Sequence, residues 1–195
     1  MNQIDIQFYK TKIGDLIFGS YNEKLCILDF RYRKMRNTVD ARIKNGLNAD
    51  FAESDSDTII QAKSQLDEYL NGDRKEFNLP LLMVGTEFQK NVWKSLMKVP
   101  YGTTSTYLQL AKDINNEKAV RAVASANGAN SIGLIVPCHR IIGSDGQLVG
   151  YGGGLSVKKR LLNLEHKNNG LTAPETFAHN KDMQPIQESF IFSAD

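Results

Sequence analysis

The sequence contains only two cysteines, Cys26 and Cys138, and three histidines among its 195 residues. This count argues against a disulfide framework and against a cysteine-rich metal centre, and two distant thiols suit a reducing compartment. No apolar run is long enough to span a bilayer. Residues 1–5 are polar and alternating rather than basic and then apolar. We therefore expect no secretory signal, no membrane association and a cytoplasmic protein, or a nuclear one in a eukaryote.

Positive charge is concentrated in one part of the chain. Residues 1–84 hold 12 Lys and Arg against 13 Asp and Glu, whereas residues 85–168 hold 11 against 5, a net charge of +6. Residues 169–195 hold 1 against 4. The basic segment, which contains Cys138, suits a polyanionic partner. On charge alone, a solvated basic surface is the simpler interpretation.

Residues 1–84 are predicted to form an N-terminal α/β domain. Polar and apolar residues alternate over 3–32, which predicts a small antiparallel sheet. Ser56 or Asp57 can cap a helix that runs to about residue 70 and ends at Asn71-Gly72. Residues 38–51 are ambiguous, and residues 77–81 fit a last strand or an extended linker.

Residues 85–168 are predicted to form a mostly helical domain. The predicted helices cover residues 87–97, 106–114, 117–127 and 156–165. The two middle helices are joined by a tight polar turn, which is the helix-turn-helix pattern. A strand is expected up to Val136, and a glycine loop at 150–154. The polar residues 169–195 are expected to be a largely disordered tail.

Cys138 follows an apolar run and a proline, and it stands next to His139. Cysteine attacks as the thiolate, and a neighbouring base raises the thiolate fraction at neutral pH. This adjacency alone leaves two interpretations about equally open, a nucleophile or a small buried hydrophobic residue. Cys26 lies in an apolar strand pattern and is interpreted as a core residue.

The segment Pro137-Cys138-His139-Arg140 resembles the active-site signature of the O(6)-alkylguanine-DNA alkyltransferases, also called methylated-DNA–protein-cysteine S-methyltransferases. The other matching segments are Thr86-Glu87-Phe88-Gln89 with Val92-Trp93, Val99-Pro100-Tyr101-Gly102 with Thr106-Tyr107, Ala119-Val120-Arg121-Ala122-Val123, Asn127-Gly128-Ala129-Asn130, Gly150-Tyr151-Gly152-Gly153-Gly154 and Leu161-Leu162-Asn163-Leu164-Glu165. The resemblance covers about residues 77–166. Over residues 1–76 only the strand-rich pattern and the length agree.

The resemblance implies an α+β protein with a ribonuclease H-like N-terminal domain, residues 1–84, and a winged-helix-like C-terminal domain, residues 85–168. It implies direct reversal of O(6)-alkylguanine damage, and of O(4)-alkylthymine damage, by a monomer bound in the minor groove of double-stranded DNA. The alkyl group would move irreversibly to Cys138, so that the protein is consumed. No cofactor would be required.

The resemblance also implies catalytic roles for five residues. Cys138 resembles the alkyl acceptor, His139 the base that works through a bound water, and Glu165 the acid that orients this histidine. Asn130 resembles the residue that fixes the turn before the active-site strand. Tyr107 resembles the residue that donates a hydrogen bond to the base and crowds the backbone phosphate.

Arg121 resembles the arginine that fills the gap left by a flipped nucleotide, where a planar guanidinium can stack and hydrogen-bond. The other residues expected at the DNA are Tyr107, Ala119, Ala122, Ser125, Asn127 and Arg140. Those expected around the base are Tyr151, Gly152, Gly153, Val136 and Pro137. Some members carry serine where this chain has Gly152, so only a backbone contact is expected there.

No metal site is predicted, because residues 1–84 contain one cysteine and no histidine to support the zinc that some relatives carry. Two functions of other classes remain open. One is a non-catalytic sensor of alkylated DNA, but such relatives replace the acceptor cysteine, and Cys138 argues against it. The other is a Cys-His hydrolase, which should turn over and should not prefer DNA.

Overall fold

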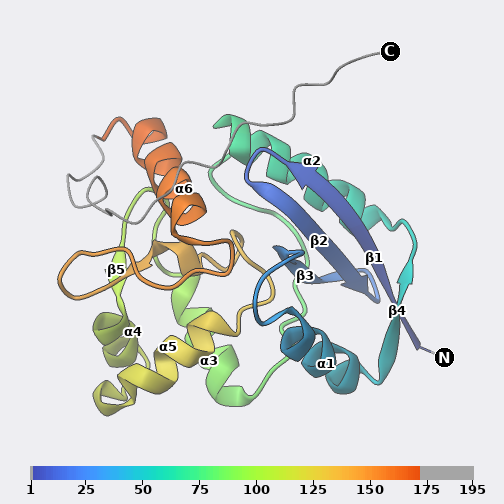
Figure 1. Ribbon diagram of the computed structural model, residues 1–195, viewed down its shortest axis with the longest axis horizontal. Coiled ribbons are helices and arrows are strands. Elements are labelled where there is room, and N and C mark those ends of the chain that lie inside the picture. Colours follow the sequence, from blue (N-terminus) through green and yellow to red (C-terminus); the bar gives the residue numbers. More distant parts are fainter. Residues whose placement is uncertain (1, 172–195) are drawn as a thin grey trace.

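The structure, a computed structural model, describes residues 2–171 (Figure 1). The N-terminal half contains β1 (Asn2–Thr11), β2 (Gly14–Tyr21), β3 (Lys24–Phe30), α1 (Arg36–Leu47), β4 (Ala49–Glu53) and α2 (Asp57–Asn71). The C-terminal half contains α3 (Glu87–Leu96), β5 (Ser105–Thr106), α4 (Tyr107–Asp113), η1 (Glu117–Ala119), α5 (Val120–Gly128), η2 (Cys138–Arg140), β6 (Ile141–Ile142) and α6 (Leu155–Asn168). Most of the tail predicted to be disordered, residues 172–195, lies outside the described residues.

The N-terminal sheet is mixed, in the order β3-β2-β1-β4. The first three strands are antiparallel neighbours, as the alternating pattern predicts, but β4 pairs with β1 in parallel. The expectation of a purely antiparallel sheet was incomplete because residues 38–51 were ambiguous. They form most of α1 and the start of β4, and a helical crossover is what allows two strands to run parallel.

The helix boundaries follow the predicted capping residues. The Ser56 side chain accepts a hydrogen bond from the backbone N–H of Ile59, and α2 ends at Gly72 with a φ of 91°, a conformation that favours glycine. Thr86 and Gln89 form a reciprocal capping box at the start of α3. The sequence therefore fixes where these two helices begin and where α2 ends.

Both faces of the sheet are covered. On one face, α2 and the helices of the C-terminal half share a single hydrophobic core with β2 and β3. On the other face, α1 packs over a smaller core that includes Cys26, which is fully buried and has its pKa raised to about 12 by burial. The prediction that Cys26 is a core residue is confirmed.

The helix-turn-helix pair is formed by α4 and α5, which pack against each other and against α3. Trp93, on α3, is buried and donates a hydrogen bond through Nε1 to the Ala126 carbonyl at 2.8 Å, which ties α3 to α5. Among the described residues, no helix has the length and apolar character needed to cross a bilayer.

The edge strand β3 connects the two halves. Its Leu28 N–H donates to the Ser131 carbonyl, and its Leu28 carbonyl accepts from the Gly133 N–H, at 2.8 and 2.7 Å. The prediction of a strand up to Val136 is therefore wrong. The chain makes only a single β-bridge, at Ile132, and then turns at Leu134, whose φ is 65°. Burial in the core, rather than a strand, explains why this run is apolar.

Candidate active site

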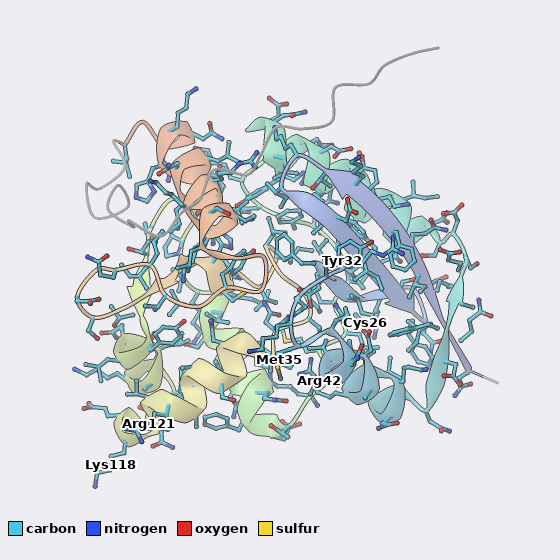
Figure 2. The ribbon with its side chains drawn as sticks, viewed as in Figure 1. Cys26, Tyr32, Met35, Arg42, Lys118 and Arg121 are labelled. Carbon is cyan, nitrogen blue, oxygen red and sulfur yellow. The ribbon has the colours of Figure 1, made fainter. Side chains whose placement is uncertain are left out.

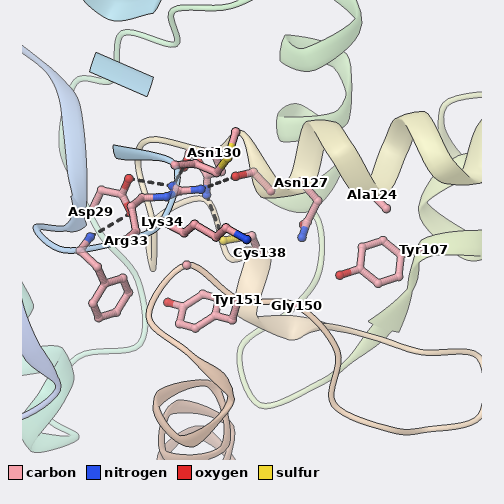
Figure 3. A pocket seen from close by; sticks show the side chains of 15 residues that line it. Asp29, Arg33, Lys34, Tyr107, Ala124, Asn127, Asn130, Cys138, Gly150 and Tyr151 are labelled. Atoms are coloured by element: carbon pink, nitrogen blue, oxygen red, sulfur yellow. Dashed lines mark hydrogen bonds and ion pairs between the residues drawn. The ribbon is translucent and has the colours of Figure 1, made fainter. Parts of the chain in front are cut away.

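Cys138 lies at the wall of a cavity of about 240 Å³ between the two halves of the molecule (Figure 3). It is the first residue of the short helix η2, directly after Pro137, and its side chain is almost buried. Burial raises the pKa of the Cys138 thiol, and a hydrogen bond from Asn130 partly opposes this effect. A proton acceptor close to the thiol would therefore assist its ionisation.

Asn130 holds the backbone around Cys138. Its Nδ2 donates to the Val136 carbonyl at 2.8 Å and to Cys138 Sγ at 3.3 Å, and its Oδ1 accepts from the Ile132 N–H at 3.0 Å. One buried amide thus replaces the hydrogen bonds that a regular strand would make. Asn130 was expected to fix this turn, and the side chain lies where it can do so.

His139 and Glu165 form a fully buried pair, with 2.8 Å between Nε2 and Oε1. Because the Glu165 carboxylate can only accept, the neutral imidazole donates its Nε2–H to Oε1 and carries its lone pair on Nδ1. Within the described residues this buried Nδ1 has no hydrogen-bond partner. Burial lowers the pKa of His139, and Glu165 only partly offsets this. The imidazole is therefore a neutral base at neutral pH.

Glu165 collects donors from both halves of the molecule. Tyr69, on α2, donates its hydroxyl at 2.5 Å, the Gly102 N–H donates at 3.0 Å, and Arg140 contributes two nitrogens at 2.9 and 3.0 Å. Burial alone would raise the pKa of Glu165, but His139 and Arg140 outweigh it and hold the pKa well below its usual range. Glu165 is a permanently charged orienting group.

Arg140 was expected to contact DNA, but the structure buries its side chain beside Glu165. Its guanidinium is buried, pairs with Glu165 and donates to the Val99 carbonyl at 2.7 Å. Val136 and Pro137, expected around the base, are also buried and lie outside the residues that line the cavity. All three residues are buried in the core beneath the cavity, because the segment 136–140 that contains them is packed into the interior.

Removing the Tyr69 hydroxyl should change the pH dependence of this site. In Tyr69→Phe, Glu165 loses one donor and attracts the imidazolium more strongly, so the pKa of His139 should rise. The resemblance implies alkyl transfer. The acid limb of that reaction with free O6-benzylguanine, measured in single turnover from about pH 5 to 8, should then move to higher pH.

Tyr101→Phe is the matched control for this prediction. The Tyr101 ring packs edge-on against Tyr69 at 5.9 Å, but its hydroxyl accepts from Asn168 rather than donating to Glu165. Its pH profile should match that of the unchanged protein. Equal profiles for both variants would show that the Tyr69 hydrogen bond does not tune His139.

The remaining walls of the cavity come from several elements. Ala124 and Asn127 of α5 lie on one side, and Gly150 and Tyr151 on the other (Figure 3). Tyr107 and Gly152 also line it. The buried Tyr151 hydroxyl has no partner within the described chain. A hydrogen-bonding ligand could therefore be held between α5 and the glycine loop.

The glycine loop fits against the N-terminal half. A Cβ atom at Gly153 would clash with the Phe30 ring, so a larger residue there would force Phe30 to move. A Cβ atom at Gly152 would make only an ordinary contact, 3.5 Å from the Arg33 side chain. Phe30 in turn packs edge-on against Tyr151, with 5.6 Å between ring centroids. Gly153 therefore allows the glycine loop to pack closely against Phe30, and it does not itself line the cavity.

The buried Lys158 of α6 holds the start of the same loop through hydrogen bonds. Its Nζ donates to the carbonyls of Ile141 and Val149 at 2.5 and 2.6 Å, and burial lowers its pKa to about 8. Sequence reasoning missed Lys158, as it missed Tyr69 and Arg33. Only Tyr69 gave a signal, because its helical spacing placed it on the buried face of α2.

The exposed face of α5 carries residues expected at the DNA. Arg121, Ala122 and Ser125 are exposed, and Arg121 projects from the first turn of the helix near Lys118 (Figure 2). Ala119 is half-buried in the turn before the helix. Asn127 is instead buried and lines the cavity, so it faces the site rather than the exposed helix surface.

Residues 2–171 contain no group of three or more His, Cys, Asp or Glu side chains that could hold a metal ion. Both cysteines are free thiols.

Two protein families match the chain, one for each half. Residues 5–83 match the 6-O-methylguanine DNA methyltransferase ribonuclease-like domain, and residues 87–167 match the DNA binding domain of the same enzymes. A methylated-DNA–protein-cysteine methyltransferase of Mycobacterium leprae is 47% identical over 170 residues, 86% of this chain and 94% of that protein. One from Methanosarcina acetivorans is 40% identical over 158 residues, 80% of this chain and 95% of that protein.

Among solved structures, Mycobacterium tuberculosis OGT in complex with DNA superimposes with a TM-score of 0.72 at 34% identity, covering 90% of this chain and 99% of that one.

Proposed function

This chain belongs to the 6-O-methylguanine DNA methyltransferase family, and from that membership we propose that Cys138 is the residue that accepts the alkyl group. The protein repairs DNA by direct reversal, as a methylated-DNA–protein-cysteine methyltransferase. We further propose that it acts on O(6)-alkylguanine and O(4)-alkylthymine in DNA. The observation that carries the assignment is a thiol at the cavity wall beside a buried His139–Glu165 pair.

The proposed reaction is a single displacement. The sulfur of Cys138 attacks the alkyl carbon, an S–C bond forms, and the bond between that carbon and the guanine oxygen breaks. The thiol proton passes to His139, whose Nδ1 has no partner among the described residues and suits a bridging water, and a proton returns to the guanine. Glu165 holds the imidazole in this tautomer. Tyr107 and Tyr151 are hydrogen-bonding groups at the cavity, and either can contact the base.

Intact-protein mass measurement tests this assignment. After incubation with an oligonucleotide carrying O6-methylguanine, the protein should gain the mass of one methyl group, and peptide mapping should locate it on Cys138. A methyl group on any other residue would contradict the proposed role of Cys138.

DNA binding is assigned to the exposed face of α5, in the minor groove, with one protein molecule per lesion. The helix presents Arg121 together with the small residues Ala122 and Ser125, which allow close approach to the groove. The target base must leave the stack, because the sulfur cannot reach its oxygen inside a duplex. Arg121 would fill the gap. Two free thiols and a DNA substrate support a cytoplasmic location, or a nuclear one in a eukaryote.

Replacing Arg121 should separate base extrusion from chemistry. Extruding a base costs a few kcal/mol, and Arg121 would stabilise the extruded state. Arg121→Ala should therefore slow repair of O6-methylguanine in duplex DNA strongly, while transfer from free O6-benzylguanine stays near its original rate. Single-turnover rates on the two substrates measure this. An equal loss on both would rule out the gap-filling role.

A further inference from the structure

The loop between β3 and α1, residues 31–35, lies at the mouth of the cavity, although it belongs to the N-terminal half. Lys34 and Met35 line the same cavity as Cys138. Figure 3 shows Lys34 and Arg33 on the side of the cavity opposite Ala124 and Tyr107. A nucleotide held in the cavity would therefore lie against this loop.

Arg33 fixes the loop to the end of α5. Its guanidinium donates to the Asn130 carbonyl at 2.8 Å and to the Gly128 carbonyl, and it pairs with Asp29 at 2.7 Å. The Arg33 side chain is almost fully buried, so these contacts hold a charged group that water cannot screen. The loop and the DNA-facing helix are thereby joined as one surface.

That surface carries the exposed ammonium of Lys34 at its rim. The exposed side of α5 runs from Arg121 to Gly128, and Met35 lies near its far end (Figure 2). Arg33 and Arg36 pair with Asp29. Lys34 is exposed and, within residues 2–171, has no hydrogen-bond or ion-pair partner. A free ammonium at the entrance complements a phosphate.

The loop also exposes apolar surface beside this charge. Tyr32 is 76% and Met35 50% exposed, and both are among the large hydrophobic side chains that residues 2–171 leave exposed. Apolar groups beside a lysine suit a nucleic-acid backbone, which presents a sugar face next to each phosphate. A second copy of the chain would need to supply a carboxylate for Lys34 instead.

We propose that this loop is a second DNA contact, in which Lys34 binds a phosphate of the strand that carries the extruded nucleotide and Met35 packs against the adjoining sugar. The inference rests on the proposed function, because it assumes that a nucleotide enters the cavity. It adds a contribution of the N-terminal half to DNA binding and positions the strand at the cavity mouth.

The test is a salt titration of DNA binding. Binding of the full chain to a labelled duplex with O6-methylguanine is followed by fluorescence anisotropy, with Cys138→Ser present in every protein to prevent reaction. Each neutralised phosphate contributes about −0.9 to the slope of log K against log salt. Lys34→Ala should therefore make the slope less steep by about one contact and weaken binding several-fold at low salt.

Lys24→Ala is the matched control. Lys24 is an exposed lysine at the opposite end of β3, about 20 Å away along the strand. It carries the same charge on the same half of the molecule and should leave the slope unchanged. Equal slopes for Lys34→Ala and Lys24→Ala would overturn the inference. Self-association that depends on Lys34 and occurs without DNA would also overturn it, by making the loop a protein interface.

Arg33→Met tests the anchor. Arg33 is a positioning residue, since it touches the carbonyl of Asn130, whose side chain contacts Cys138. Its positive charge also lowers the pKa of the thiol. Arg33→Met should therefore weaken DNA binding and shift the pH profile of transfer from free O6-benzylguanine to higher pH.

Arg36→Met is the control for Arg33→Met. Within the described residues, Arg36 pairs with the same Asp29 but makes no hydrogen bond to Gly128 or Asn130. Identical behaviour of the two variants would reject the anchor. These outcomes are separable from the assignment of Cys138, because methylation of Cys138 in the otherwise unchanged protein is measured independently.

Discussion

Cys138→Ser should abolish alkyl transfer to the protein while leaving binding to a methylated duplex nearly unchanged. The serine hydroxyl occupies almost the same volume and can still accept the hydrogen bond that Asn130 donates to Cys138 Sγ. It is a far weaker nucleophile, because an alcohol ionises at neutral pH much less than a thiol does. Methyl transfer is measured by protein mass, and binding by anisotropy.

Cys26→Ala provides the matched control. Cys26 is fully buried on the α1 side of the sheet, away from the cavity, and burial keeps it in the thiol form. This variant should transfer the alkyl group at the rate of the unchanged protein. Transfer that survives in Cys138→Ser, or is lost in Cys26→Ala, would contradict the account.

Glu165→Gln should be the most destabilising of the proposed changes. It leaves the buried Arg140 without its carboxylate and removes the charge that orients His139. Breaking a buried ion pair by removing one partner costs about 3–5 kcal/mol, so urea unfolding should show a loss of this size. Transfer should also fall strongly, because the imidazole is no longer held in one tautomer.

The pH dependence of this loss has a defined sign. The folded pKa of Glu165 lies below its ordinary value of 4.5. Its stabilisation is therefore fully present above that value and is lost as the pH falls below it. The difference between the unchanged protein and Glu165→Gln should shrink in acid. A difference that grows as the pH falls would mean that Glu165 is not held charged.

A double variant separates folding from catalysis. Glu165→Gln with Arg140→Met removes both buried charges, and it should recover part of the lost stability. It should not recover transfer, because His139 still lacks its carboxylate. Full recovery of transfer would show that Glu165 acts only through the stability of the fold.

Local sequence signals predicted much of the fold. Ser56 and Thr86 cap their helices because their side chains accept a nearby backbone N–H, which is a property of the neighbouring residues alone. The antiparallel part of the sheet also follows from a local alternation. The parallel strand β4 could not be predicted in this way, because its pairing with β1 depends on how α1 crosses the sheet.

The site residues also separate into those that local motifs predict and those that depend on distant contacts. Cys138, His139 and Glu165 were predicted from a resemblance in short motifs, and the structure brings His139 and Glu165 into contact. Tyr69 and Arg33 were missed because they reach the site from the N-terminal half across about 100 residues of sequence. The burial of Arg140 was missed for the converse reason, since an arginine beside an active-site motif gives no local sign of its partner.

The stoichiometry of the reaction tests the central claim most directly. Nothing in the described site supplies a second nucleophile that could remove an alkyl group from Cys138, and Cys26 lies buried on the other face of the sheet. With a methylated duplex in large molar excess, and without added metal or nucleotide, repair should stop at one methyl group per protein molecule. Repaired DNA in clear molar excess over protein would contradict the account and favour an enzyme that turns over.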